Sequence, residues 1–91
     1  NKMTDENLSI LRKDIEHLLS EEYGCNYRII NYDPRPNLIT NIFGITLTVE
    51  VKMPDETFRR AHVRKGTNNE VMKEVRNQIG ATQTILEKHY L

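Results

Sequence analysis

Cysteine, proline and glycine are scarce in this sequence, and their scarcity excludes several classes of protein. The chain of 91 residues has one cysteine, three prolines and four glycines, so it holds no low-complexity tract. A single cysteine, Cys25, excludes an internal disulfide and cannot form a zinc site by itself. No apolar run approaches the ~18 residues of a membrane span, and the first residues are no signal peptide. We therefore expect an intracellular protein, nuclear or cytoplasmic, with no membrane span.

An excess of charge of one sign is also missing, because 13 basic and 13 acidic side chains cancel. The charges are nevertheless unevenly distributed along the chain. Residues 1–26 carry a net charge of −3, residues 27–58 carry −1 and residues 59–91 carry +4. An acidic first segment and a basic last third point to an anionic partner.

The length predicts one domain over residues 1–91 with one modest core, since a chain of this size buries roughly 60–65% of its unfolded surface. Apolar residues make up 37% and charged residues 29%, and periodic stretches argue against disorder. The chain begins with Asn1 and has its first methionine at Met3. We therefore expect it to be a piece of a larger protein.

The first segment has the pattern of a helix over residues 5–22. Thr4 is a suitable N-cap, Asp5 and Glu6 lie in the first turn, and Gly24 is a typical stop. Apolar residues recur at helical spacing at Leu8, Leu11, Ile15 and Leu18, and Leu19 widens this stripe. This stripe indicates packing on a sheet, or alternatively two heptads of a coiled coil that continues upstream.

Three strands are predicted after this helix. The first covers residues 27–32 and ends at Asp33-Pro34-Arg35-Pro36-Asn37, because proline cannot continue a ladder. The second covers residues 43–53, where apolar and polar residues alternate strictly. The third covers residues 57–64, after a turn at residues 54–56.

A second helix is predicted after Thr67-Asn68-Asn69-Glu70, which matches a capping box. Its apolar stripe is Val71, Val75, Ile79, Thr82 and Leu86. This stripe predicts a helix that passes through Gly80 towards the C-terminus, or alternatively two shorter helices with a break at Gly80.

The order α-β-β-β-α predicts an α+β fold, a two-layer sandwich in which both helices pack on one face of a three-stranded antiparallel sheet. The buried contacts should join Leu11, Ile15 and Leu18 to the apolar side of the second strand, at Ile45, Leu47, Val49 and Val51. The other face of the sheet should be exposed.

Signs of catalysis are missing from the sequence. It has no nucleophile elbow, no phosphate-binding glycine loop and no paired-histidine metal spacing. We interpret Cys25 as a small buried residue and His17, His62 and His89 as surface side chains. We expect a domain that is no enzyme and has no cofactor and no metal site.

A basic cluster is the main candidate for a binding site. Arg59, Arg60, His62, Arg64 and Lys65 fall within seven residues that contain no acid. The start of the second helix, at Thr67, Asn68 and Asn69, offers free backbone N–H groups, and Lys73 lies one turn further on. These nine residues are the predicted contacts with a nucleic-acid backbone. The alternative is an edge strand whose charges prevent sheet extension.

The order and several segments resemble the double-stranded RNA-binding domain over nearly the whole chain. The segments that carry the similarity are Tyr27-Arg28-Ile29-Ile30, Thr48-Val49-Glu50-Val51-Lys52-Met53, Thr57-Phe58, Gly66-Thr67-Asn68-Asn69-Glu70-Val71, Ala81 and Ile85-Leu86-Glu87-Lys88. The family's lysine pair falls on Asn68 and Asn69, its next lysine on Met72, and its third-strand glycines on Arg60, Ala61 or Val63.

The resemblance implies a non-catalytic module that binds duplex or structured RNA weakly, through phosphates and 2′-hydroxyls. It also implies a parent protein of RNA processing or RNA silencing, such as a ribonuclease III-type enzyme. The alternative is a protein-interaction or dimerisation domain, with a protein partner or as a homodimer, without nucleic-acid binding. In element order alone, the chain is also similar to the globular heads of kinetochore and monopolin-type coiled-coil proteins.

Overall fold

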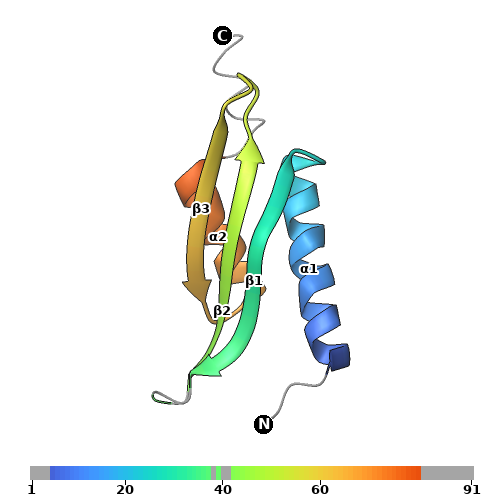
Figure 1. The fold of residues 1–91 in the computed structure, drawn as a ribbon, viewed down its shortest axis with the longest axis vertical. Helices are drawn as coiled ribbons and strands as arrows, with labels where there is room; N and C mark the ends of the chain where they lie inside the picture. Colours follow the sequence, from blue (N-terminus) through green and yellow to red (C-terminus); the bar gives the residue numbers. More distant parts are fainter. Residues whose placement is uncertain (1–4, 38, 40–41, 81–91) are drawn as a thin grey trace.

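The computed structural model describes residues 5–37, 39 and 42–80. Within them the order is helix α1 (Asp5–Tyr23), strands β1 (Tyr27–Asn37), β2 (Ile42–Lys52) and β3 (Phe58–Lys65), and helix α2 (Asn68–Ile79) (Figure 1). The predicted order α-β-β-β-α is confirmed. None of the helices in these ranges has the length and apolar character needed to cross a membrane.

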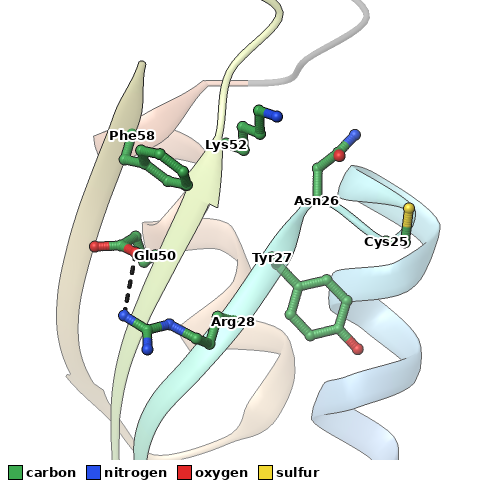
Figure 2. A pocket seen from close by; sticks show the side chains of 7 residues that line it. All are labelled: Cys25, Asn26, Tyr27, Arg28, Glu50, Lys52 and Phe58. Atoms are coloured by element: carbon green, nitrogen blue, oxygen red, sulfur yellow. Dashed lines mark hydrogen bonds and ion pairs between the residues drawn. The ribbon is translucent and has the colours of Figure 1, made fainter. Parts of the chain in front are cut away.

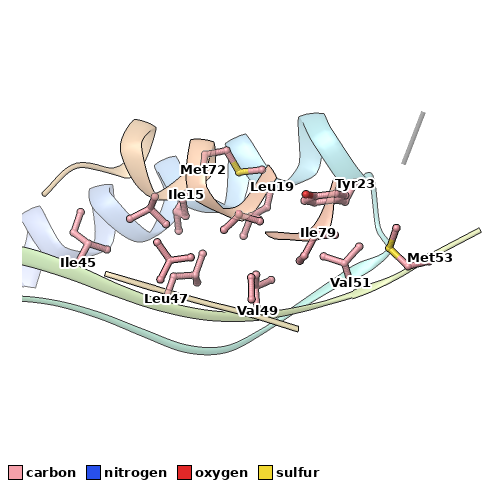
Figure 3. Packing of buried hydrophobic residues seen from close by; sticks show 14 residues of the cluster. Ile15, Leu19, Tyr23, Ile45, Leu47, Val49, Val51, Met53, Met72 and Ile79 are labelled. Atoms are coloured by element: carbon pink, nitrogen blue, oxygen red, sulfur yellow. The ribbon is translucent and has the colours of Figure 1, made fainter. Parts of the chain in front are cut away.

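The strands form one antiparallel sheet in the order β1-β2-β3, with β2 in the middle. Both helices lie on the same side of this sheet, and the buried side chains fill the space between the two layers (Figure 3). The fold is therefore the predicted two-layer α+β sandwich. Helices on one side only leave the second sheet face without a covering helix in the described chain.

Strand β1 is longer than predicted, because it continues through the segment that was expected to end it. Pro34 pairs with Ile45 of β2, and Pro36 pairs with Phe43. Proline is tolerated at the edge of a sheet when its missing N–H would point away from the neighbouring strand. Two prolines two residues apart satisfy this condition together, since alternate residues share one side of a strand.

The other edge of the sheet, along β3, receives a side chain from α2. The backbone N–H of His62 donates to Oε1 of Gln78 at 3.3 Å, and Nε2 of Gln78 donates to the carbonyl of His62 at 3.4 Å. The amide of Gln78 thus occupies backbone groups to which an added strand would bind. Proline on β1 and Gln78 on β3 make both edges poor sites for sheet extension.

The core joins the helices to β2, with a small change from the expected stripe on α1. Ile45, Leu47, Val49 and Val51 are buried as predicted. On α1 the buried residues are Ile15, Leu19 and Tyr23, at spacings of four, whereas Leu11 is half-buried and Leu18 packs at the margin of the core. The apolar side of α1 is therefore used inside the domain, as the sheet-packing interpretation predicts.

Helix α2 begins as predicted and ends earlier than its apolar stripe indicated. The hydroxyl of Thr67 accepts a hydrogen bond from the backbone N–H of Glu70 at 3.2 Å. The helix ends at Ile79, and Gly80 has a φ of 92°, a backbone conformation that strongly favours glycine. A continuous helix through Gly80 is thus wrong, and the break is right. Thr82 and Leu86 lie outside the described residues.

Two side chains hold the C-terminal end of α2. The hydroxyl of Tyr23 donates to the carbonyl of Gly80 at 3.0 Å, and Nη1 of Arg59 donates to the carbonyl of Ile79 at 2.9 Å. Carbonyls at a helix end have no partner within the helix. Tyr23 and Arg59 supply these partners from α1 and β3, so the end of α2 is fixed to both layers.

Substitution of the buried Ile15 tests the packing of α1. Ile15 is 0% exposed, so Ile15→Ala should lower the free energy of unfolding by about 2–5 kcal/mol. Ile10 is a matched control on the same helix, since it is 58% exposed, and Ile10→Ala should cost less than about 0.5 kcal/mol. Urea unfolding measures both. If both variants lose the same free energy of unfolding, the buried side of α1 is not the one that contains Ile15.

The burial of the Tyr23 phenol predicts a loss of stability at alkaline pH. Burial raises the pKa of Tyr23 from 10.0 to about 12, so the fold favours the neutral phenol. Its contribution is complete below pH ~10 and is lost as the pH rises towards 12, by up to roughly 2–3 kcal/mol. Between pH ~9 and ~11.5, the free energy of unfolding should fall more in the unaltered protein than in Tyr23→Phe. If the free energy of unfolding depends on pH in the same way in both proteins, ionisation of Tyr23 is not the cause of the alkaline loss of stability.

Candidate nucleic-acid interface

The sheet face opposite the helices, here called the open sheet face, carries the polar residues of all three strands. The register of the strands and the alternation along each strand place thirteen residues on this face. They are Arg28, Asn31, Asp33 and Arg35 from β1, Gly44, Thr46, Thr48, Glu50 and Lys52 from β2, and Phe58, Arg60, His62 and Arg64 from β3.

One row of this face is an arginine–glutamate–arginine triad across the three strands. Nη2 of Arg28 lies 3.3 Å from Oε1 of Glu50, and Nη2 of Arg60 lies 3.2 Å from Oε2 of the same carboxylate. The side chain of Glu50 is 20% exposed, whereas those of Arg28 and Arg60 are 71% and 59% exposed. Glu50 therefore holds two guanidinium groups whose remaining N–H groups face the solvent.

Two further rows hold His62 and Arg64 against β2. Nδ1 of His62 is 2.7 Å from Oγ1 of Thr48, and Nη1 of Arg64 donates to Oγ1 of Thr46 at 2.9 Å. The guanidinium of Arg64 lies over Gly44, where an added Cβ would be 2.5 Å from Nη2. A glycine at this position lets Arg64 lie flat on the strand, so its position is set by the sheet.

Charge separates the two sides of the molecule. The open sheet face has five cationic side chains, Arg28, Arg35, Lys52, Arg60 and Arg64, against two carboxylates, Asp33 and Glu50. On the other side, α1 has six acidic residues and two basic ones. The uneven charge seen along the sequence thus becomes a basic face and an acidic helix.

The basic cluster found in the sequence is divided between the two sides of the sheet. Arg60, His62 and Arg64 lie on the open sheet face. Arg59 lies on the helix side and binds the end of α2. Lys65 pairs in register with the core residue Ile45, so it also belongs to the helix side. Adjacent residues of a strand point to opposite faces of the sheet, so basic residues that follow one another in β3 do not form one surface patch.

The start of α2 does not form the expected anion site with these arginines. Thr67 caps the helix, and its hydroxyl also donates to the carboxylate of Glu70 at 3.0 Å. The carboxylate thus lies beside the N-terminal N–H groups that would bind a phosphate. Asn69 and Lys73 are exposed on this side. They are separated by the sheet from Arg60 and Arg64.

Asn68, predicted to contact RNA, is instead a buried structural residue. Its side chain is 5% exposed. Nδ2 donates to the carbonyl of Leu11 at 2.9 Å and to Oδ2 of Asp14 at 3.0 Å, and Oδ1 accepts from the hydroxyl of Tyr32 at 2.7 Å. All its polar atoms are used within the domain, so we remove Asn68 from the candidate contacts.

A shallow pocket lies at one end of the open sheet face (Figure 2). It is lined by β1, β2 and β3 together with the turn after α1, through Cys25, Asn26, Tyr27, Arg28, Glu50, Lys52 and Phe58. Neither the pocket nor the exposed Phe58 was predicted from the sequence.

Cys25 and the histidines complete the comparison with the sequence predictions. Cys25 is exposed at the rim of the pocket, so its interpretation as a buried residue is wrong. Cys25 follows Gly24 in the turn beyond α1, whereas Tyr23, the last residue of α1, reaches the core. His17 and His62 are exposed as predicted. His89 lies outside the described residues.

No family model, curated protein sequence or solved structure matches the chain.

Two adjacent asparagines allow a direct test of the role of Asn68. Asn68→Ala removes three hydrogen bonds from a buried position, each worth about 1 kcal/mol, so the free energy of unfolding should fall by about 2–3 kcal/mol. Asn69 is exposed one position later in α2, and Asn69→Ala should change the free energy of unfolding by less than about 0.5 kcal/mol. Urea unfolding measures this free energy for both variants. Similar stability of both variants would mean that Asn68 is dispensable to the fold.

Proposed function

We propose that this chain is a non-catalytic RNA-binding module, and that it holds duplex or structured RNA through the phosphates with its open sheet face. The observation that supports this proposal is the excess of cations there, five against two carboxylates, opposite an acidic helix. A polyanion approaching the molecule would be attracted to the sheet and repelled from α1.

The arrangement of the arginines suits a phosphate backbone. Guanidinium groups donate in a planar fork that fits phosphate oxygens. The backbones of Arg28 and Arg60 are two strand spacings apart, or roughly 10 Å, but their guanidinium groups converge on the carboxylate of Glu50. Arg60 and Arg64 are four residues apart along β3, or roughly 13 Å. The Arg28–Arg60 pair and Arg64 can therefore contact different phosphates. A handful of contacts implies micromolar or weaker binding, with a salt slope of about −0.9 for each phosphate neutralised.

This proposal moves the interface away from the site that the family resemblance implied. That site was the start of the last helix, where the family's lysine pair is replaced by Asn68 and Asn69. Here Asn68 is buried, Glu70 lies at the helix N-terminus and α1 beside it is acidic. The basic residues of the open sheet face are the better partners for RNA.

The competing function is protein interaction or dimerisation without nucleic acid. A coiled coil through α1 is disfavoured because Ile15, Leu19 and Tyr23 on its apolar side are buried within the domain. Dimerisation by sheet extension is disfavoured by the prolines of β1 and by Gln78 at β3. Neither route accounts for the open sheet face.

The parent protein and its location are part of the same proposal. A weak, phosphate-reading module suits a larger protein of RNA processing or RNA silencing, in which another domain carries out the chemistry. Such a protein works in the nucleus or the cytoplasm.

Removing two arginines from the open sheet face tests the proposal. Binding to a duplex RNA of about 20 base pairs, longer than the ~16 that a double-stranded RNA-binding domain spans, is followed by fluorescence anisotropy between about 50 and 200 mM salt. Arg60→Gln combined with Arg64→Gln should weaken binding to all duplex sequences alike. The slope of log K against log salt should become flatter by about 2.

The matched control removes the same charge from the helix side, with Arg12→Gln and Lys13→Gln on α1. This control should leave the slope unchanged. Absence of salt-dependent binding by the unaltered protein at about 50 mM salt would refute an RNA role. Loss of binding in Lys73→Ala, with no effect of Arg60→Gln and Arg64→Gln, would move the interface back to α2. Retained binding to an acidic protein alone would establish the competing function.

A further inference from the structure

We infer that the pocket at the end of the open sheet face receives an unpaired nucleobase of the bound RNA, which stacks on Phe58. This inference rests on the proposed function and names the part of the RNA that the pocket reads. It changes the expected ligand from a plain duplex to RNA with an unpaired nucleotide, as at a bulge, a loop or an end.

The main observation is an aromatic ring exposed on a basic surface. Phe58 begins β3 and pairs in register with Lys52. It is 62% exposed, whereas Phe43, the other phenylalanine, is half-buried and packs against the core. An exposed ring in a positively charged surface is the usual platform on which a base of single-stranded RNA stacks.

The charged groups of the pocket are placed to bind the rest of the nucleotide. Arg28 and Lys52 line the pocket beside Phe58 (Figure 2). Lys52 is loosely paired with Glu56 at 4.0 Å and its side chain is 46% exposed, so it can contact a phosphate. The base would lie between these cations and Phe58.

Glu50 gives the pocket an acceptor as well. Glu50 lines the pocket, and its carboxylate is fixed by Arg28 and Arg60. A carboxylate accepts hydrogen bonds from the amino groups of cytosine or guanine, and it repels a bare phosphate. The pocket therefore favours a base at its floor and phosphates at its cationic rim.

A regular duplex cannot use this pocket, because its bases are stacked and paired. Extrusion of a base costs a few kcal/mol, but a base that is already unpaired avoids this cost. The open sheet face would hold the phosphates of any RNA, and the pocket would add affinity only where a base is free. The two parts of the surface therefore make separate predictions.

Substitution of Phe58 separates them. The probes are a fluorescein-labelled single-stranded RNA of about 12 nucleotides and mixed sequence, and a blunt duplex of about 20 base pairs. Phe58→Ala should weaken binding of the single strand about tenfold and that of the blunt duplex less than about twofold. Phe58→Tyr keeps the ring and should restore binding of the single strand. The exposed Ile10 provides the control, and Ile10→Ala should affect neither RNA.

Ring resonances give a second, independent measurement. The chain has two phenylalanines, so their aromatic signals are easily assigned by nuclear magnetic resonance with the help of Phe58→Tyr. Stacking of a base should shift the ring protons of Phe58 upfield during titration with the single strand. The ring of Phe43, on the helix side, should not shift.

The outcomes distinguish this inference from the proposed function. If Phe58→Ala has no effect on either RNA, while Arg60→Gln and Arg64→Gln flatten the salt dependence, the pocket inference is wrong and the proposed function stands. Equal weakening of both RNAs by Phe58→Ala would also refute base stacking, since a blunt duplex offers no free base. If the unaltered protein binds neither RNA, both proposals fail together.

Discussion

One buried polar side chain, that of Asn68, connects three of the five elements. It is the first residue of α2, its amide donates to Leu11 and Asp14 of α1, and it accepts from Tyr32 of β1. A buried amide without these partners would cost about 1–3 kcal/mol, so the two helices and β1 must meet in this arrangement. Burial raises the pKa of Tyr32 above its ordinary value. Both helices are thus held on one side of the sheet.

The open sheet face is a consequence of that arrangement. Two helices are enough to cover one side of three strands, and the described chain has no further element for the other side. An antiparallel sheet tolerates this, because its strands alternate apolar and polar residues. The strand that most clearly showed this alternation in the sequence, β2, is also the one with residues in both the core and the candidate interface.

Much of the fold was predictable because it follows from periodicity. The order of elements, the alternation in β2 and the cap at Thr67 depend on neighbouring residues and were correctly predicted. The continuation of β1 through Pro34 and Pro36 was not, because it depends on the strand lying at a sheet edge. The same holds for the end of α2 at Gly80, where Tyr23 and Arg59 bind the last carbonyls from other elements.

The candidate site was predicted only in part, and the reason is again geometric. A run of basic residues in a strand is divided between two faces, so Arg59 and Lys65 lie on the helix side of the sheet. Arg28 of β1 and Lys52 of β2, which are distant in the sequence, lie on the open sheet face instead. Asn68 was misassigned because nothing in its local sequence indicates burial. Phe58 could have been noticed earlier, since an aromatic residue that shares the polar side of a strand with Arg60 and His62 has no core to enter.

The arginines of the open sheet face are held by internal partners that a ligand must share. Arg28 and Arg60 would repel each other across β2 if Glu50 were absent, and the carboxylate between them offsets this repulsion. The same carboxylate reduces the net charge offered to a phosphate, since three groups together carry a single positive charge. The arrangement therefore favours defined geometry over strong attraction. We therefore expect a weak attraction for any polyanion and a stronger one for a ligand whose shape fits fixed guanidinium groups and an exposed ring. The weak binding by charge and the discrimination by a single pocket that we propose would thus both follow from the placement of Glu50.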